Sequence, residues 1–379
     1  MTGEAEPETT RAGRLACFCP PGVAMAGKRL AGGLAQLASG FALAVLAQTL
    51  ATSLLPLAGL WLAPRPALMP VPYMAMLTGA AVSTFPASYL LDAFGRRASF
   101  ALGASHGLAG GLMMAWALSA GAFWPFCLGA FWLGVAQGFT LFYRHEAAIG
   151  QSVKEKGFAI AMVFGAGALA GLIGPALLLL LEHLSPASRN IGIALGAAFA
   201  QVLVLTVAVS SAPSELARPV EAASEMNLQD FIISTVIAAA AWFGMTAQML
   251  AMPGAMVGCG VTLSSMFGVM AFHVMAMYAP AFAIGPLTRR FGVASVSVAG
   301  LGLIVLAKVV ARDARDVTDF AIVLGLLAIG WSLATTAATL WLHHRGSPPR
   351  LWLAGHDALL FLAALAGAAL SAQPMVGLL

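Results

Sequence analysis

Long apolar runs alternate with short polar segments along almost the whole chain. A membrane-spanning helix needs about 20 consecutive, predominantly apolar residues to cross the hydrocarbon core. Eleven runs meet this need, at about residues 30–53, 67–91, 99–120, 121–143, 157–182, 188–210, 228–251, 259–284, 293–311, 318–341 and 350–371. The pattern therefore predicts an all-α polytopic protein in a lipid bilayer.

The composition agrees with the pattern. Hydrophobic residues make up 60% of the 379 residues, charged residues only 9%, and the mean hydropathy is +0.90. A soluble domain has about 25% charged residues. A soluble fold is therefore excluded.

The nineteen Lys and Arg residues predict how the chain is oriented. With a cytoplasmic N-terminus, fourteen fall on the cytoplasmic side, namely Arg11, Arg14, Lys28, Arg29, Arg96, Arg97, Arg144, Lys154, Lys156, Arg218, Arg289, Arg290, Arg345 and Arg350. Five fall outside, namely Arg65, Arg189, Lys308, Arg312 and Arg315. Because cytoplasmic loops carry the excess of positive residues, we interpret these residues as topology signals rather than a nucleic-acid surface.

Polar stretches divide the chain into two groups of spans. Residues 1–29 are expected to form a cytoplasmic tail, and residues 30–210 hold six spans. Residues 211–227 are expected to form a cytoplasmic linker, and residues 228–379 hold the other five spans. A twelfth span is not evident, because the residues after Ala372 are too few to cross a bilayer.

Similar loops follow the second and the eighth runs, at residues 92–97 and 285–292, which predicts a six-helix unit repeated in parallel. The first loop resembles the G-x-x-x-D-x-x-G-R-R signature of the major facilitator superfamily. Ser88 replaces its first glycine, and Arg289 takes the Asp position of the second loop. The resemblance implies two six-helix halves around a central substrate path. We expect a gating role for the signature residues, which are Asp92, Gly95, Arg96 and Arg97.

Two stripes of soft side chains mark the seventh and eighth runs. The first holds Met245, Met249, Met252 and Met256, and the second holds Met266, Met270, His273 and Met277. Their spacing of i, i+4, i+7 and i+11 places each stripe on one helix face, although Pro253 and Gly254 are expected to interrupt the first. Thioether sulfur and imidazole nitrogen suit Cu(I). Methionine also fills gaps in apolar cores, so the residues alone fit copper binding and packing alike.

The MxxxM pair Met245 and Met249 and the HxxxM pair His273 and Met277 resemble those of the CcoA-like copper importers, the CalT family of major facilitators. The resemblance implies a transporter of the bacterial inner membrane that imports copper, as Cu(I), by alternating access. It also implies that the copper supplies cbb-type cytochrome oxidase assembly, with copper chaperones as partners. Copper would be the transported substrate rather than a fixed cofactor. Family members without these motifs resemble riboflavin transporters.

The four cysteines form no disulfide framework. Cys259, at the start of the eighth run, is an additional candidate ligand, and a small packing residue fits there equally. Cys17 and Cys19 form a close thiol pair in the tail, which we interpret as incidental. Met25 offers a second candidate start of translation.

Few ionisable residues fall inside the apolar runs. Asp357, beside His356, is the only carboxylate that is clearly inside one, and such residues are functional candidates by default. His106 is expected to be a packing residue. His343 and His344 are expected in a solvated loop. The driving force stays open between uniport, exchange and proton coupling through His273 or Asp357.

Two other functions remain in view. An organic solute such as riboflavin or a drug-like compound could bind an apolar pocket near Trp242, Phe243, Phe267 and Phe272. A non-transporting membrane assembly factor is the second alternative. Enzyme activity has little support, because no G-x-S-x-G, HExxH or Walker A motif occurs in a suitable context.

Overall fold

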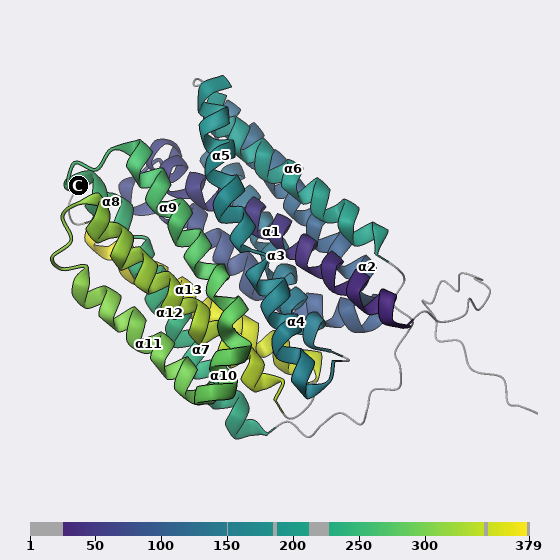
Figure 1. Ribbon diagram of the computed structural model, residues 1–379. Helices are drawn as coiled ribbons and strands as arrows, with labels where there is room; N and C mark the ends of the chain where they lie inside the picture. Colours follow the sequence, from purple (N-terminus) through teal and green to yellow (C-terminus); the bar gives the residue numbers. More distant parts are fainter. Residues whose placement is uncertain (1–25, 150, 185–187, 212–226, 345–347, 377–379) are drawn as a thin grey trace, which may run out of the picture.

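The computed structural model describes residues 26–149, 151–184, 188–211, 227–344 and 348–376, and every regular element in these ranges is helical. The helices lie side by side in one bundle (Figure 1). They are α1 (Ala26–Leu62), η1 (Pro66–Leu68), α2 (Val71–Ala120), α3 (Phe123–Ala148), α4 (Val153–Gly165), α5 (Ala168–Leu184), α6 (Arg189–Ser210), α7 (Leu228–Met249), α8 (Met252–Gly258), α9 (Leu263–Tyr278), η3 (Ala279–Ala283), α10 (Ile284–Phe291), α11 (Val293–Val310), α12 (Val317–Leu342) and α13 (Arg350–Val376). The predicted all-α fold is confirmed.

The helix α2 contains two predicted spans. Among the described residues, ten helical segments are long and apolar enough to cross a membrane, and the longest, Pro66–Ala120, has 55 residues. Gly95 interrupts it with φ 75° and ψ 179°, which is a backbone conformation that glycine alone adopts readily. The chain folds back there, because Gly79 and Gly110, on either side of Gly95, both pack on residues 129–133 of α3. Counting both arms of α2 gives eleven crossings in the part of the chain that the structure describes, and the apolar runs predict the same number.

Three other spans are built from shorter helices. The fifth consists of α4 and α5, the seventh of α7 and α8, and the eighth of α9, η3 and α10. The sequence predicts an interruption at Pro253 and Gly254, but α7 ends earlier, at Met249, and α8 begins at Met252. Pro253 lies in the first turn of α8, where a missing N–H removes no hydrogen bond.

The helices form two groups. The helices α1 to α6 pack mainly on one another, and so do α7 to α13; we call these groups the N-half and the C-half. They meet where α2 packs on α13, α5 on α9, and α4 on η3. Most of the predicted linker, most of the predicted tail, Cys17, Cys19 and Met25 lie outside the described residues.

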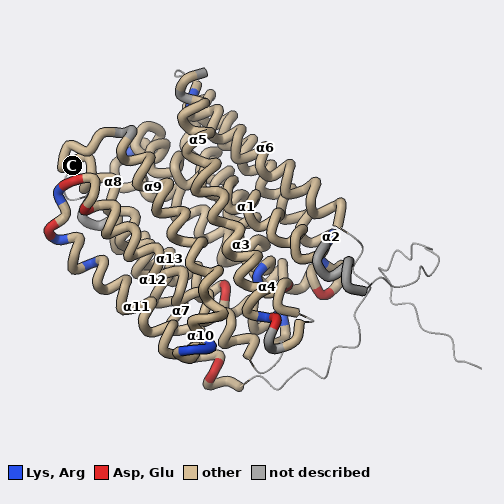
Figure 2. Tube along the Cα trace, viewed as in Figure 1, with Lys and Arg blue, Asp and Glu red and all other residues tan. Residues whose placement is uncertain are grey.

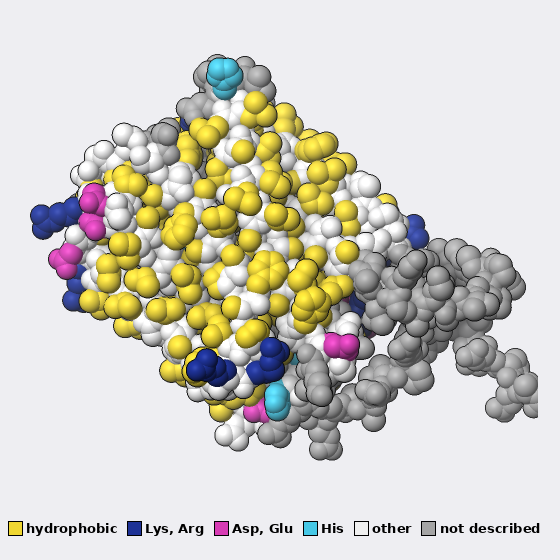
Figure 3. All heavy atoms as spheres, in the orientation of Figure 1, with side chains coloured by type: hydrophobic (Ala, Val, Ile, Leu, Met, Phe, Trp, Pro, Cys, Tyr) yellow, Lys and Arg dark blue, Asp and Glu magenta, His cyan; other side chains and the backbone are white. Residues whose placement is uncertain are grey.

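The surface has the character of a membrane protein. Large apolar side chains are exposed along the helices, among them Trp116, Phe199 and Val305, and they spread over the visible face in Figure 3. Charged residues gather at the two ends of the bundle (Figure 2). We call the end that carries Asp92 and Arg350 the motif end. The charge distribution of the loops predicts that this end is cytoplasmic.

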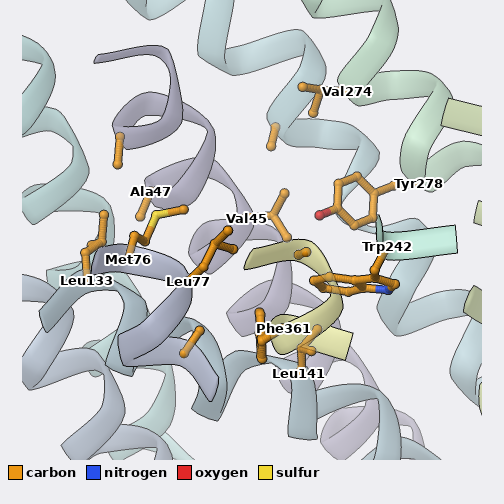
Figure 4. Packing of buried hydrophobic residues seen from close by; sticks show 14 of the residues in the cluster. Val45, Ala47, Met76, Leu77, Leu133, Leu141, Trp242, Val274, Tyr278 and Phe361 are labelled. Atoms are coloured by element: carbon orange, nitrogen blue, oxygen red, sulfur yellow. The ribbon is translucent and has the colours of Figure 1, made fainter. Parts of the chain in front are cut away.

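An aromatic core fills the middle of the interface between the halves. Trp242 packs on Phe361 with ring centroids 5.2 Å apart, and on Trp331 at 5.4 Å. Tyr278 contacts Trp331 at 5.9 Å and Phe164 of the N-half at 5.2 Å. Figure 4 shows Trp242, Tyr278 and Phe361 beside aliphatic side chains of the N-half. We call these five aromatic residues the aromatic core.

Candidate functional site

The methionine stripes face the interior of the protein. Met245, Met252 and Met256 are buried in the main hydrophobic cluster. The other stripe methionines are partly buried against the same cluster, namely Met249, Met266, Met270 and Met277. The two motif helices α7 and α9 both pack on α12, and neither packs extensively on the other. Burial suits packing and ligand binding alike, so the ligand roles stay predictions.

His273 has one nitrogen without a partner. The ring is fully buried, and Nδ1 donates a hydrogen bond to the carbonyl oxygen of Leu324 at 2.9 Å. Because a carbonyl only accepts, the proton of the neutral ring is on Nδ1. Nε2 is then an acceptor, and it has no hydrogen-bond partner in the described part of the chain. An acceptor of this kind can ligate a soft or borderline metal ion.

The remaining candidate ligands do not assemble a metal site of the usual kind. Cys259 is exposed at the end of α8. Within the described residues, no group of three or more His, Cys, Asp or Glu side chains is placed to hold a metal ion. A copper site near His273 would therefore depend on methionine sulfur.

Two of the four predicted gating residues, Asp92 and Arg96, lie in a network of charges that joins the halves at the motif end. Arg350, at the start of α13, donates to Asp92 through Nη1 and to Glu146 Oε1 through Nε at 2.7 Å. Arg96 donates to Glu146 Oε2, and its Nη2 donates to the Glu146 carbonyl at 2.8 Å. Arg97 is exposed. We call Asp92, Arg96, Glu146 and Arg350 the outer latch.

A second charged group lies deeper in the same interface. Arg144 Nη2 donates to Asp357 Oδ1 at 2.5 Å, and His145 Nε2 lies 3.3 Å from the same oxygen. His145 Nδ1 lies 3.1 Å from Nε2 of His343. His356 Nδ1 lies 2.9 Å from the hydroxyl of Thr235. All the titratable members are at most 1% exposed, and we call them the inner cluster: Arg144, His145, His343, His356 and Asp357.

The structure corrects two expectations for this region. Arg144 was expected at the cytoplasmic side beyond the fourth run, and His343 was expected in a solvated loop; both are fully buried. The third helix continues to Ala148, past the predicted end at residue 143, so Arg144 stays inside the bundle. His343 is the C-cap of α12, and Lys156 of α4 donates to its carbonyl at 3.0 Å. Burial lowers the pKa of His343 well below its ordinary value, and the neighbouring positive charges add to this effect.

The structure also tests the expectations for Asp357 and His106. Asp357 lies inside a span, as predicted. Glu146 is a second buried carboxylate inside a span, so Asp357 is not the only one. His106 stacks on Trp132 at 4.9 Å and hydrogen-bonds the Leu102 carbonyl, which agrees with a packing role.

The interface consists of three successive layers. On α13, Arg350 of the outer latch precedes Asp357 of the inner cluster by seven residues, roughly 10 Å along the helix axis. Phe361 of the aromatic core follows four residues later, roughly 6 Å further. Each layer contains side chains of both halves. The three layers therefore follow one another along α13, from the motif end toward the middle of the bundle.

A bundle of two helical halves, joined along a buried interface and closed by charges at one end, defines a polytopic membrane carrier. The chain is 31% identical over 291 residues to the riboflavin transporter RfnT of Brucella anthropi. The matched residues make up 75% of this chain and 73% of that protein. Its fold is similar to the human organic anion transporter MFSD10, with a TM-score of 0.67 and 17% identity over 92% of this chain and 93% of that one. The E. coli xylose transporter XylE gives a TM-score of 0.65 and 14% identity, with coverage of 91% and 90%.

The chain therefore belongs to the major facilitator superfamily, whose members are transporters and not enzymes. No protein-family model matches it. The likeness to the solved structures shows the shared fold.

Proposed function

We propose that this secondary transporter carries a planar organic solute of the riboflavin type through the interface between its halves. The observation that carries this proposal is the aromatic core, which places Trp242, Trp331 and Tyr278 together in the path between the halves. Aromatic rings bind planar ring systems by stacking, which is worth about 1–3 kcal/mol for each ring in nucleobase complexes. The named relative, a riboflavin transporter, supports the same class of cargo.

Copper is a second candidate, and a different observation favours it. His273 Nε2 is a buried acceptor without a partner in the described part of the chain, and His273 shares its helix face with methionines. The resemblance of Met245, Met249, His273 and Met277 to the copper-importer motifs supports this candidate. The same resemblance is the basis for three further parts of the copper proposal: import as Cu(I), a supply of copper to cytochrome oxidase, and exchange with copper chaperones.

One uptake experiment separates the two cargoes. Cells that express the chain receive radiolabelled riboflavin or radioactive copper, and uptake is compared between Trp331→Ala and the combined variant Met245→Leu, Met249→Leu and His273→Gln. For a flavin carrier, Trp331→Ala should lower riboflavin uptake at low concentration by roughly 5- to 150-fold, and the combined variant should retain it. Met113→Leu, a partly buried methionine of the N-half, is the matched control.

The opposite result would replace the first cargo with the second. Copper uptake that is lost in the combined variant and kept in Met113→Leu would establish the soft ligands. Absence of uptake of both cargoes by the wild-type chain, at normal abundance in the membrane, would contradict both candidates.

A further inference from the structure

Four hydroxyl side chains lie along one side of α12, between its residues of the aromatic core and of the inner cluster. Their spacing of i, i+3, i+4 and i+7 places them on one side of the helix. They are Ser332, Thr335, Thr336 and Thr339, and each is at most 1% exposed. We call them the hydroxyl row.

The neighbours of the hydroxyl row place it at the interface between the halves. Trp331 directly precedes the row and contacts Phe164 of the N-half, with ring centroids 5.7 Å apart. His343 follows the row and contacts α3 of the N-half through the inner cluster. Thr335 lies four residues after the first of these contacts, and Thr339 lies four residues before the second. Because residues four apart share a helix face, the row faces the N-half.

Two hydroxyl groups of the row have no partner. Hydroxyl side chains inside a helix often bond a carbonyl of the preceding turn. Thr336 Oγ1 donates to the Ser332 carbonyl at 2.6 Å, and Thr339 Oγ1 donates to the Thr335 carbonyl at 2.9 Å. Ser332 Oγ and Thr335 Oγ1 have no hydrogen-bond partner in the described part of the chain. Since buried polar groups are nearly always hydrogen-bonded, these two hydroxyl groups indicate a place for polar groups of a ligand.

The chemistry of the hydroxyl row suits a ligand with several hydroxyl groups. None of the four side chains carries a charge, and the unpaired hydroxyl groups of Ser332 and Thr335 can both donate and accept. A charged group of a ligand would find no counter-ion within the row, and burial would make it costly. The row extends over the seven residue steps from Ser332 to Thr339, roughly 10 Å along the helix axis. A short, extended chain of hydroxyl groups can therefore lie along it.

The aromatic core adjoins one end of the hydroxyl row. Trp331 precedes Ser332 in the chain, and its ring packs on Trp242 at 5.4 Å. The buried Nε1 of Trp242 has no hydrogen-bond partner among the described residues. Because an indole N–H only donates, it suits a carbonyl oxygen on the ring of a ligand. The interface thus offers stacking faces with a free donor, followed by a line of hydroxyl groups.

We propose that the hydroxyl row binds the polyhydroxyl chain of a cargo whose planar ring is held by the aromatic core. The inference rests on the proposed function and narrows the cargo class to planar rings that carry a neutral polyhydroxyl chain, as riboflavin does. Ser332 and Thr335 determine the specificity, because their hydroxyl groups gain partners only from such a chain.

The test measures flavin binding to the purified full-length chain in detergent, through the quenching of flavin fluorescence. The probes are riboflavin and lumiflavin, which has the same ring with a methyl group in place of the polyhydroxyl chain. The wild type should bind riboflavin roughly 5- to 150-fold more tightly than lumiflavin, the range that two hydrogen bonds supply. Ser332→Ala combined with Thr335→Val should weaken riboflavin binding by this factor and leave the affinity for lumiflavin within about twofold.

A second double variant is the matched control. Thr84→Val combined with Ser297→Ala also removes two fully buried hydroxyl groups. Each of these two groups donates to a carbonyl of its own helix and is therefore already paired. The control should keep the wild-type preference for riboflavin. Lumiflavin binding by the Ser332→Ala, Thr335→Val variant shows that this variant is folded.

The outcomes separate this inference from the proposed function. Equal affinity of the wild type for the two flavins would overturn the inference and leave a flavin carrier in place. An unchanged preference for riboflavin in the Ser332→Ala, Thr335→Val variant, or an equal loss of both affinities, would overturn it as well. Binding of neither flavin by the wild type would contradict the proposed function, and the inference with it.

Discussion

Two buried carboxylates, Glu146 and Asp357, dominate the interface between the halves at the residue scale. Each is fully buried in a chain with few charges, and each has arginine as its partner. Taking a charge out of water is costly unless an opposite charge and further hydrogen bonds compensate for it. The stability of the closed interface therefore depends on pairs of residues rather than on single ones.

The Arg144–Asp357 pair should behave as a unit in measurements of stability. Arg144→Gln or Asp357→Asn alone should destabilise the folded carrier by about 3–5 kcal/mol, because each leaves a buried charge without its partner. The double variant should lie much closer to the wild type. Thermal unfolding of the detergent-purified protein measures the effect, with the exposed Arg97→Gln as the control. Additive losses in the double variant would contradict the coupling.

The sequence predicts the buried position of Asp357 but not its partner. Hydropathy places the end of the fourth predicted span at residue 143. The three polar residues that follow, Arg144, His145 and Glu146, resemble a loop when each residue is scored by its own hydropathy. Only the packing of α3 against α13 shows that these residues pair across the interface. The two stripes, which hold Met245 and His273, face the interior, yet burial alone leaves the ligand roles as predictions.

At the scale of the helices, glycine allows the closest contacts. Gly79, Gly134 and Gly138 lie where α2 and α3 cross, and a Cβ on Gly134 would overlap the carbonyl oxygen of Met76. Glycine-rich membrane helices pack closely in this way. The sequence shows that glycine is abundant, but it does not show which glycines lie at a crossing.

Gly134→Ala should therefore loosen the N-half. Forcing a methyl group into this crossing should cost about 1–3 kcal/mol, because the backbones must move apart. Gly302→Ala is the matched control, since Gly302 of α11 is exposed and has no atom within 4 Å of an added Cβ. We expect a lower midpoint of thermal unfolding for Gly134→Ala and an unchanged or higher one for Gly302→Ala. Equal midpoints would show that this crossing is tolerant.

At the scale of the whole molecule, the motif end is closed. The outer latch, the inner cluster and the contact of α4 with α10 all join the halves there. The repeated loop motifs predict two groups of spans and a gating loop at residues 92–97. The three-layer interface could not be predicted, because each layer brings together residues that are far apart in the chain.

A covalent link across this end tests whether the halves must separate. A Cβ on Gly157 of α4 would lie 3.9 Å from Gly285 Cα of α10, which is within the reach of a disulfide. Gly157→Cys with Gly285→Cys should cross-link on oxidation and stop uptake of both riboflavin and copper, and a reductant should restore it. Arg350→Gln should slow the cross-linking, because the latch then closes less often.

The single variant Gly157→Cys controls for the native cysteines, such as Cys127 and Cys259. Undiminished uptake by the fully cross-linked protein would mean that cargo crosses the membrane without separation of this end.

The shared carboxylate of the outer latch has an evolutionary consequence. Glu146 accepts hydrogen bonds from Arg96 of its own half and from Arg350 of the other, and Arg350 also pairs with Asp92. A lineage that lost Arg350 would leave a buried acid half-compensated, so the next accepted changes should fall on Glu146 or Asp92. Related sequences should therefore vary at these positions in concert, while the exposed Arg97 drifts on its own.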